Sequence, residues 1–156
     1  MSTTRVTALL RAPRAAVYQA LTDPAMIGRW RFPDGMTSVV ELREDGGFRV
    51  TLTYEATDGQ GKTTARSDTY RARFTHLVPA ELVVEVDEFE TADPQLAGEM
   101  TMTIGLRDSD GGTELLAVHE GVPPGVAPED NELGWRMALD RLAALVEGRP
   151  TPARPG

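Results

Sequence analysis

Hydrophobic and polar residues alternate with a period of two over most of the middle of the chain, from Ser38 to Gly121. This alternation is typical of strands that bury one face, and turns rich in Gly, Asp and Pro separate its segments. Because most of these turns are short, neighbouring segments are predicted to pair as an antiparallel meander. The pattern predicts six consecutive strands, over residues 38–44, 47–56, 63–79, 81–90, 99–108 and 113–121.

The N-terminal part of the chain begins with a further strand candidate over residues 3–11. Pro13 then suits the first turn of a short helix that extends to Asp23. Asp23 is in turn a candidate N-cap for a second short helix over residues 24–30, which ends in Trp30. This part of the chain therefore predicts one strand followed by two short helices.

The C-terminal part has the longest helical pattern of the chain, over residues 132–148. Acidic residues precede and open it, where a helix N-terminus favours negative charge, and Gly148 suits the position that follows a helix. A wide apolar face is formed by Trp135, Ala138, Leu139, Leu142, Leu145 and Val146.

These elements predict an α+β protein in which a curved, seven-stranded antiparallel sheet surrounds the long C-terminal helix. A sheet with one apolar face must cover that face, and this helix is the only long element available to do so. We expect a single domain over residues 1–148 and a flexible tail over residues 149–156. A tapered space should remain between sheet and helix, and the two short helices would close one end of it. Trp30 would lie at that mouth, either as a gate or as a packing plug.

Composition and charge narrow the partners that we expect. The formal net charge is -8 with a pI of about 4.8, and no basic stripe is present, so nucleic acid is disfavoured as a partner. The chain has no cysteine, which excludes disulfides, thiolate metal sites and cysteine nucleophiles. We find neither a signal-peptide pattern nor an apolar run long enough to span a membrane. The protein is therefore expected to be cytoplasmic, with no membrane partner.

Four stretches of the sequence together resemble a known family. They are similar, in the same order, to the activator of heat-shock-protein ATPase homologues, a branch of the START-like (SRPBCC) superfamily. The resemblance implies a helix-grip fold, with a cavity between sheet and helix for an apolar or amphipathic small molecule. The eukaryotic founder carries an additional N-terminal domain, which we do not find here, so a chaperone partner is not expected. The matching stretches are "APRAAVYQALTDPAMIGRW", "EDGGFRV", "GGTELLAVHEGVP" and "ELGWRMALDRLAALVEG".

Aromatic and methionine side chains are the main candidates for the lining of such a cavity. Apolar walls with a few polar groups are typical of ligand sites, and methionine adapts to irregular contents. The same side chains could instead fill a solid core. The candidate ligand-binding residues are Trp30, Phe48, Tyr54, Tyr70, Phe74, Met100, Met102, His119 and Trp135.

Catalytic candidates are few. His76 and His119 are the only histidines, and each is predicted on an inward face, where it could act as a general acid or base or simply form a structural hydrogen bond. Their spacing matches no metal-binding motif, and we expect neither a metal nor another cofactor. Glu85 and Asp87 are predicted to lie on the solvated side of their strand, together with other acids that pair with arginines of the neighbouring strand.

Three functional hypotheses remain open at this point. The first is a protein that binds a hydrophobic or amphipathic small molecule without an assigned reaction. The second is an enzyme of the cyclase or hydrolase type known in the wider superfamily, polyketide cyclases included, with His119 as the best catalytic candidate. The third is a chaperone-cofactor-like interaction module. A homodimer formed through an exposed strand edge is also possible.

Overall fold

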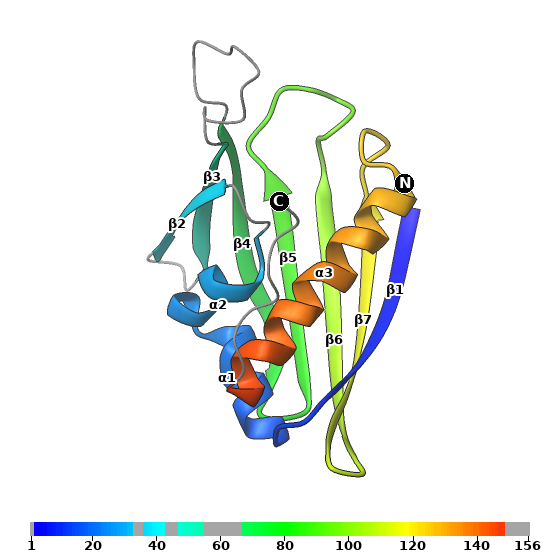
Figure 1. Ribbon diagram of the computed structural model, residues 1–156. Helices are drawn as coiled ribbons and strands as arrows, with labels where there is room; N and C mark the ends of the chain where they lie inside the picture. The colour runs from blue at the N-terminus through cyan, green and yellow to red at the C-terminus, as the bar shows by residue number, and fades with distance from the viewer. Residues whose placement is uncertain (1, 33–35, 43–46, 55–66, 149–156) are drawn as a thin grey trace, which may run out of the picture.

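The computed structural model describes residues 2–32, 36–42, 47–54 and 67–148. It confirms the α+β fold that the sequence predicts, with one antiparallel sheet and three helices (Figure 1). The strands are β1 (Ser2–Leu10), β2 (Met36–Leu42), β3 (Phe48–Tyr54), β4 (Ser67–Val78), β5 (Leu82–Phe89), β6 (Glu99–Ser109) and β7 (Gly112–Val122).

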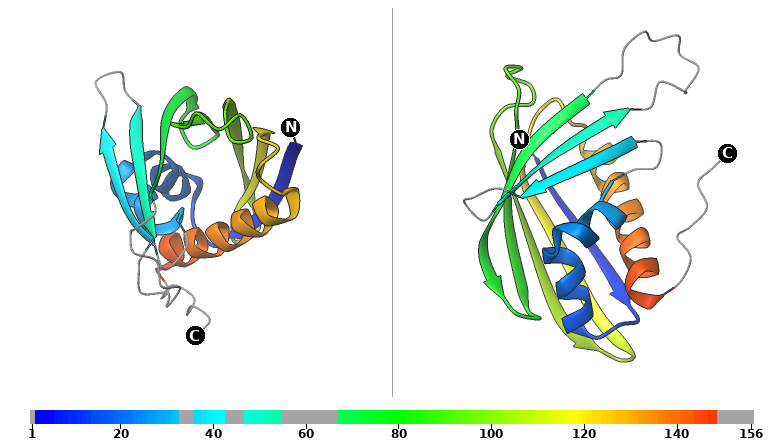
Figure 2. Two further views of the ribbon diagram at one scale, coloured as in Figure 1. Left: turned by 90° about the horizontal axis from the view of Figure 1, so that it is seen from above. Right: turned by 90° about the vertical axis from the view of Figure 1, so that its left-hand side faces the viewer.

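The sheet has seven strands in the order β1-β7-β6-β5-β4-β3-β2. Strands β2 to β7 pair in sequence order as a meander, and β1 joins the free edge of β7. Every pairing is antiparallel. Seen from above, the sheet curls into an open ring, and the C-terminal helix lies along the open side of that ring (Figure 2).

Two short helices, α1 (Arg14–Thr22) and α2 (Pro24–Trp30), follow the first strand. The Asp23 side chain caps α2, because its carboxylate accepts a hydrogen bond of 3.0 Å from the backbone N–H of Ala25. Pro24 occupies the first turn of α2, where its missing N–H costs no intrahelical hydrogen bond. The local sequence thus defines both the end of α1 and the start of α2.

The long helix α3 (Pro128–Glu147) begins four residues earlier than the hydrophobic pattern predicts. Pro128 is compatible with a first turn, and the acidic side chains of Glu129 and Asp130 favour a helix N-terminus. The helix ends at Gly148, whose φ of 71° lies in the left-handed region that favours glycine. Among the described residues, no helix is long and apolar enough to cross a membrane.

The core is concentrated at the end of the molecule where α1 and α2 meet the sheet and α3. Helix α3 packs on β1 and on the two short helices, and Leu139 and Leu142 are buried there beside Leu10 and Leu115. A second buried cluster, formed by Ile27, Phe48, Val50, Tyr70 and Ala72, joins α2 to β3 and β4. Helix α3 is anchored on β1 and on the two short helices, and a space remains between α3 and the central strands of the sheet.

Candidate functional site

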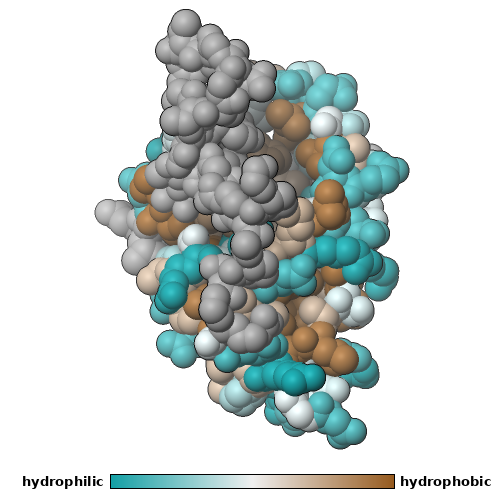
Figure 3. Space-filling model, viewed as in Figure 1, coloured by the Kyte–Doolittle hydropathy of each residue, from teal (hydrophilic) through white to brown (hydrophobic). Residues whose placement is uncertain are grey.

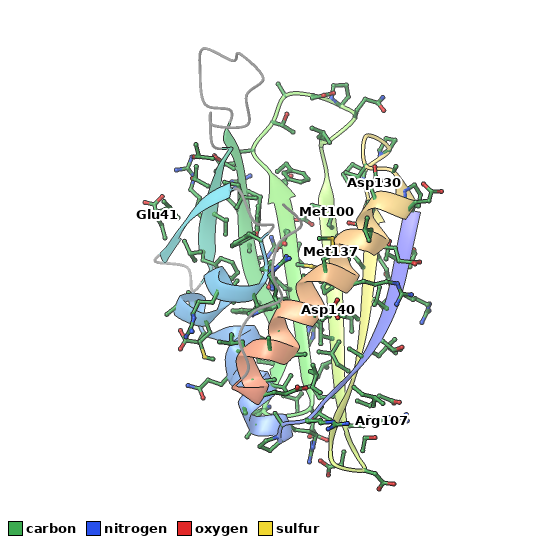
Figure 4. The ribbon with its side chains drawn as sticks, viewed as in Figure 1. Glu41, Met100, Arg107, Asp130, Met137 and Asp140 are labelled. Carbon is green, nitrogen blue, oxygen red and sulfur yellow. The ribbon has the colours of Figure 1, made fainter. Side chains whose placement is uncertain are left out.

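A cavity of about 530 Å³ lies between the concave face of the sheet and α3. Its walls come from β3 to β7, from α3 between Asp130 and Arg141, and from Trp30 at the end of α2 together with Arg31 and Phe32. Met100 borders it from the sheet, whereas Asp130 and Met137 border it from α3 (Figure 4). In the space-filling view, hydrophobic side chains border a hollow beside the N-terminal half of α3 (Figure 3). This size is within the range of cavities that hold small organic ligands.

Most of the predicted ligand-binding residues lie on the wall of this cavity. Phe48 and Phe74 do not; their rings pack against each other with centroids 5.7 Å apart, outside the cavity lining. The side chain of Tyr54 lies outside the described residues. The six that line the cavity are Trp30, Tyr70, Met100, Met102, His119 and Trp135.

Trp30 belongs to the packed core and also lines the cavity. It is buried in the main core, and its indole N–H donates a hydrogen bond of 2.9 Å to the carbonyl of Ala20. In a continuous helix that carbonyl would accept from the N–H of residue 24, but Pro24 has none. Trp30 therefore satisfies a backbone group that the proline leaves free and ties α2 to the end of α1.

A buried ion pair forms the first polar feature of the cavity. Arg31 binds Glu85 of β5 through two hydrogen bonds, of 2.6 Å from Nη1 and 3.1 Å from Nη2. Although burial opposes the charge of each side chain, their mutual attraction raises the pKa of Arg31 and lowers the pKa of Glu85, so both stay charged. Burial raises the pKa of the nearby Tyr70 phenol, and the positive charge of Arg31 opposes this shift.

Asp87, the next inward-facing residue of β5, is buried beside this pair. Burial, followed by the negative charge of Glu85, raises the pKa of the Asp87 carboxyl well above its usual value. The Oδ1 atom of Asp87 is buried and has no hydrogen-bond partner among the described residues. The raised pKa favours the neutral form of Asp87 beside the ionised Glu85.

His119 of β7 is the second polar feature and lies 8% exposed on the opposite wall. Its Nδ1 accepts a hydrogen bond of 3.0 Å from the Trp135 indole, and the Asn131 amide nitrogen lies 3.2 Å from the same atom. Burial, with a contribution from the positive charge of Arg31, lowers the pKa of His119 to about 4, so the ring is neutral at pH 7. Its Nε2 atom is buried without a hydrogen-bond partner in the described part of the chain.

The predicted side-chain directions of Glu85 and Asp87 are wrong. Glu85 and Asp87 face the interior rather than solvent, because each pairs across the strands with residues of the buried face: Glu85 with Phe74 and Met102, and Asp87 with Ala72 and Met100. The segment 81–90 carries valines on both faces, so alternation alone did not show which face is buried. The registers of the two hairpins show it, since directly paired residues share a face.

His76 was predicted to face inward beside Phe74, but its side chain is exposed. The register between β4 and β5 shifts between Phe74 and His76, and such an irregularity reorients the side chains that follow it. The outer acids behave as predicted, since Glu88 pairs with Arg71 at 2.9 Å. No group of three or more metal-ligating side chains occurs in the ranges that the structure describes.

A curled antiparallel sheet that holds a long C-terminal helix across a cavity defines a helix-grip protein of the START-like class. The family model described as "Activator of Hsp90 ATPase homolog 1-like protein" matches residues 11–147. The chain therefore belongs to this family.

Solved structures agree with this assignment. Protein CV1439 from Chromobacterium violaceum is 31% identical, with a TM-score of 0.80 over 94% of this chain and 99% of that one. A Rhodobacter sphaeroides protein is 20% identical, with a TM-score of 0.72 over 94% and 93% of the two chains. DynU16, described as a putative protein in the dynemicin biosynthetic locus, is 21% identical, with a TM-score of 0.64 over 98% of this chain and 50% of that one. No curated protein matches the sequence.

Proposed function

We propose that this protein binds a hydrophobic or amphipathic small molecule in the cavity between the sheet and α3. The observation that carries the proposal is the cavity itself, about 530 Å³ in volume and lined mainly by aromatic and aliphatic side chains. Met100 and Met102 form part of its wall, and methionine adapts to ligands of irregular shape. The likeness to DynU16 supports only the fold, since the two chains are 21% identical.

A catalytic base at His119 is not part of this proposal. The lone pair of the neutral ring is on Nδ1, and that atom already accepts a hydrogen bond from the Trp135 indole. The ring nitrogen that remains, Nε2, carries the proton and can donate but not accept. His119 therefore contributes a polar contact rather than a site for proton abstraction.

The test is a titration with the uncharged fluorescent probe Nile red. The wild type should bind with one saturable site, and Met102→Trp, which places an indole in the cavity, should weaken binding at least about tenfold. Leu116→Trp is the matched control, because Leu116 is 40% exposed on the outer face of β7, away from the cavity. It should bind as the wild type does.

Circular dichroism and thermal unfolding establish that each variant is folded. Should Met102→Trp fail to fold, Ala138→Leu fills the cavity from the α3 side with a smaller side chain. A wild type that binds no apolar probe, or two folded filling variants that bind as well as the control, would contradict the proposal.

A further inference from the structure

The polar groups of the cavity define what kind of ligand it can accept, if the proposed function holds. His119 provides a hydrogen-bond donor. Indole N–H groups only donate, so the bond of 3.0 Å from Trp135 requires an unprotonated Nδ1 on His119. The neutral ring then carries its proton on Nε2, which is buried and has no partner among the described residues. An unpaired buried donor is unfavourable until something accepts from it.

Asp87 provides the complementary acceptor. Its Oδ1 is buried without a hydrogen-bond partner in the described part of the chain, and the Asp87 side chain lines the cavity. Arg31 keeps Glu85 ionised through two hydrogen bonds. Burial, followed by this negative charge, raises the pKa of the Asp87 carboxyl and favours its neutral form, which can still accept a hydrogen bond.

The sheet register places these two groups on opposite sides of the cavity. Asp87 pairs with Met100 of β6, and Met102 of β6 pairs with His119 of β7. The backbones of β5 and β7 are therefore separated by one strand, or roughly 10 Å. Both methionines lie on the wall between the two polar groups. A ligand that satisfies both groups must lie across the methionines.

We infer that the cavity recognises an uncharged, mainly apolar molecule with a carbonyl group at one end and a hydroxyl group at the other. The carbonyl accepts from Nε2 of His119, and the hydroxyl donates to Oδ1 of Asp87. The apolar body between them contacts Met100 and Met102 and the rings of Tyr70 and Trp135, all of which line the cavity.

A carboxylate ligand fits these groups less well. Nη1 and Nη2 of Arg31 already bind both oxygens of Glu85, and only its Nε is left without a hydrogen-bond partner among the described residues. A second anion there would be repelled by the ionised Glu85. Arg141, the other buried cation on the wall, donates from Nε to the carbonyl of Trp30 at 2.9 Å, at the end of the cavity where α2 meets α3. Strong selection of a carboxylate would therefore mean that recognition is centred on Arg141.

The experiment uses a matched series of small aromatic probes and measures their dissociation constants by isothermal titration calorimetry. Para-hydroxybenzophenone has both groups, benzophenone lacks the hydroxyl, para-benzylphenol lacks the carbonyl and diphenylmethane lacks both. Para-benzoylbenzoate replaces the hydroxyl with a carboxylate. We expect each correct group to strengthen binding about tenfold, as for a buried hydrogen bond that satisfies an unpaired partner. The carboxylate should bind more weakly than para-hydroxybenzophenone.

Variants assign each preference to one side chain. Asp87→Leu should remove the preference for the hydroxyl, whereas Asp87→Asn should keep it, because an amide reproduces the neutral acid with one acceptor and one donor. His119→Phe should remove the preference for the carbonyl. His119→Gln should restore part of it, since its oxygen can accept from Trp135 while its N–H₂ donates to the ligand. Each preference is the ratio of the dissociation constants of two probes on the same variant. A general loss of stability therefore does not change it.

The outcomes separate this inference from the proposed function. If all five probes bind with similar affinity, the cavity binds apolar molecules and the inference is wrong. It is also wrong if the carboxylate binds best, or if Asp87→Asn loses the hydroxyl preference. If no probe binds, the proposed function and the inference both fail. Photocrosslinking of bound benzophenone to Met100 or Met102, mapped by mass spectrometry, would place a positive result in the cavity.

Discussion

The buried ion pair between Arg31 and Glu85 offers the sharpest test of the electrostatics of this fold. The two side chains are 11% and 1% exposed and are joined by two hydrogen bonds. Arg31→Met removes the cation but retains much of its apolar volume. The variant leaves the Glu85 carboxylate buried without its partner.

We expect Arg31→Met to lower the free energy of unfolding by about 3–5 kcal/mol at pH 7, the usual cost of breaking a buried pair. For a chain of this length, that loss lowers the Tm by roughly 6–20 °C. In the wild type the pKa of Glu85 is lowered by folding. The contribution of Glu85 to stability is therefore present at neutral pH and is lost as the pH falls through the pKa of the folded state. In the variant the attraction of Arg31 is gone, and burial, the largest remaining influence, raises the pKa of Glu85. The deficit should therefore be largest at neutral pH and should shrink as the pH approaches about 4.3, the ordinary pKa of a glutamic acid.

Urea unfolding followed by tryptophan fluorescence, at several pH values, measures these differences. Arg71→Met is the matched control, because Arg71 pairs with Glu88 at 2.9 Å on the outer face of the sheet, where the two side chains are 48% and 38% exposed. An exposed pair of this kind contributes about 0–1 kcal/mol. The double variant Arg31→Met/Glu85→Gln should recover part of the lost stability, since it removes the unpaired charge. An Arg31→Met loss no larger than that of Arg71→Met, or one independent of pH, would refute this reasoning.

Three further predictions concern single side chains. Asp87→Asn should stabilise the protein at pH 7, because the raised pKa of Asp87 makes the folded state hold a proton that the unfolded chain releases. This gain in stability should vanish below about pH 3.9, where the unfolded chain also holds the proton. A difference in urea unfolding that does not depend on pH would contradict the prediction. Gly112→Ala should cost about 1–3 kcal/mol, since a Cβ there would clash with the carbonyl oxygen of Leu10. Calorimetry should show a much smaller effect for Gly105→Ala, where a Cβ would have nothing within 4 Å. Trp30→Phe should lower the free energy of unfolding by about 1–3 kcal/mol, because the carbonyl of Ala20 loses its hydrogen-bond donor. A smaller loss in chemical unfolding would mean that another group or water satisfies that carbonyl.

The regular elements could be predicted because their causes are local. The alternation of apolar residues indicated β2 to β7, and residues 3–11 were a further strand candidate that corresponds to β1. The described ends differ from the predicted ends by a few residues. Asp23 caps α2 and Gly148 follows α3 as expected, because capping depends on residues close in sequence. The α3 start was placed too late because an apolar face marks only the packed part of a helix.

The candidate site was predicted only in part. Met100, Met102 and Trp135 were expected in the cavity because strand alternation and helix periodicity assign them to inward faces. The buried acids Glu85 and Asp87 were missed, since their strand is apolar on both faces and acidic residues are rarely buried without a partner. That partner is Arg31, 54 residues away from Glu85 in the sequence.

The sequence by itself determined the helix-grip architecture, because periodicity, caps and turns act between residues that are near neighbours in the chain. Only the tertiary structure decided the chemistry of the cavity. Whether a carboxyl is charged, or which nitrogen of His119 carries the proton, depends on burial and on groups from distant elements: Arg31 after α2 for the acids, and Trp135 of α3 for the histidine. Those contacts exist only once the sheet has curled around the helix, and no local pattern of residues specifies them.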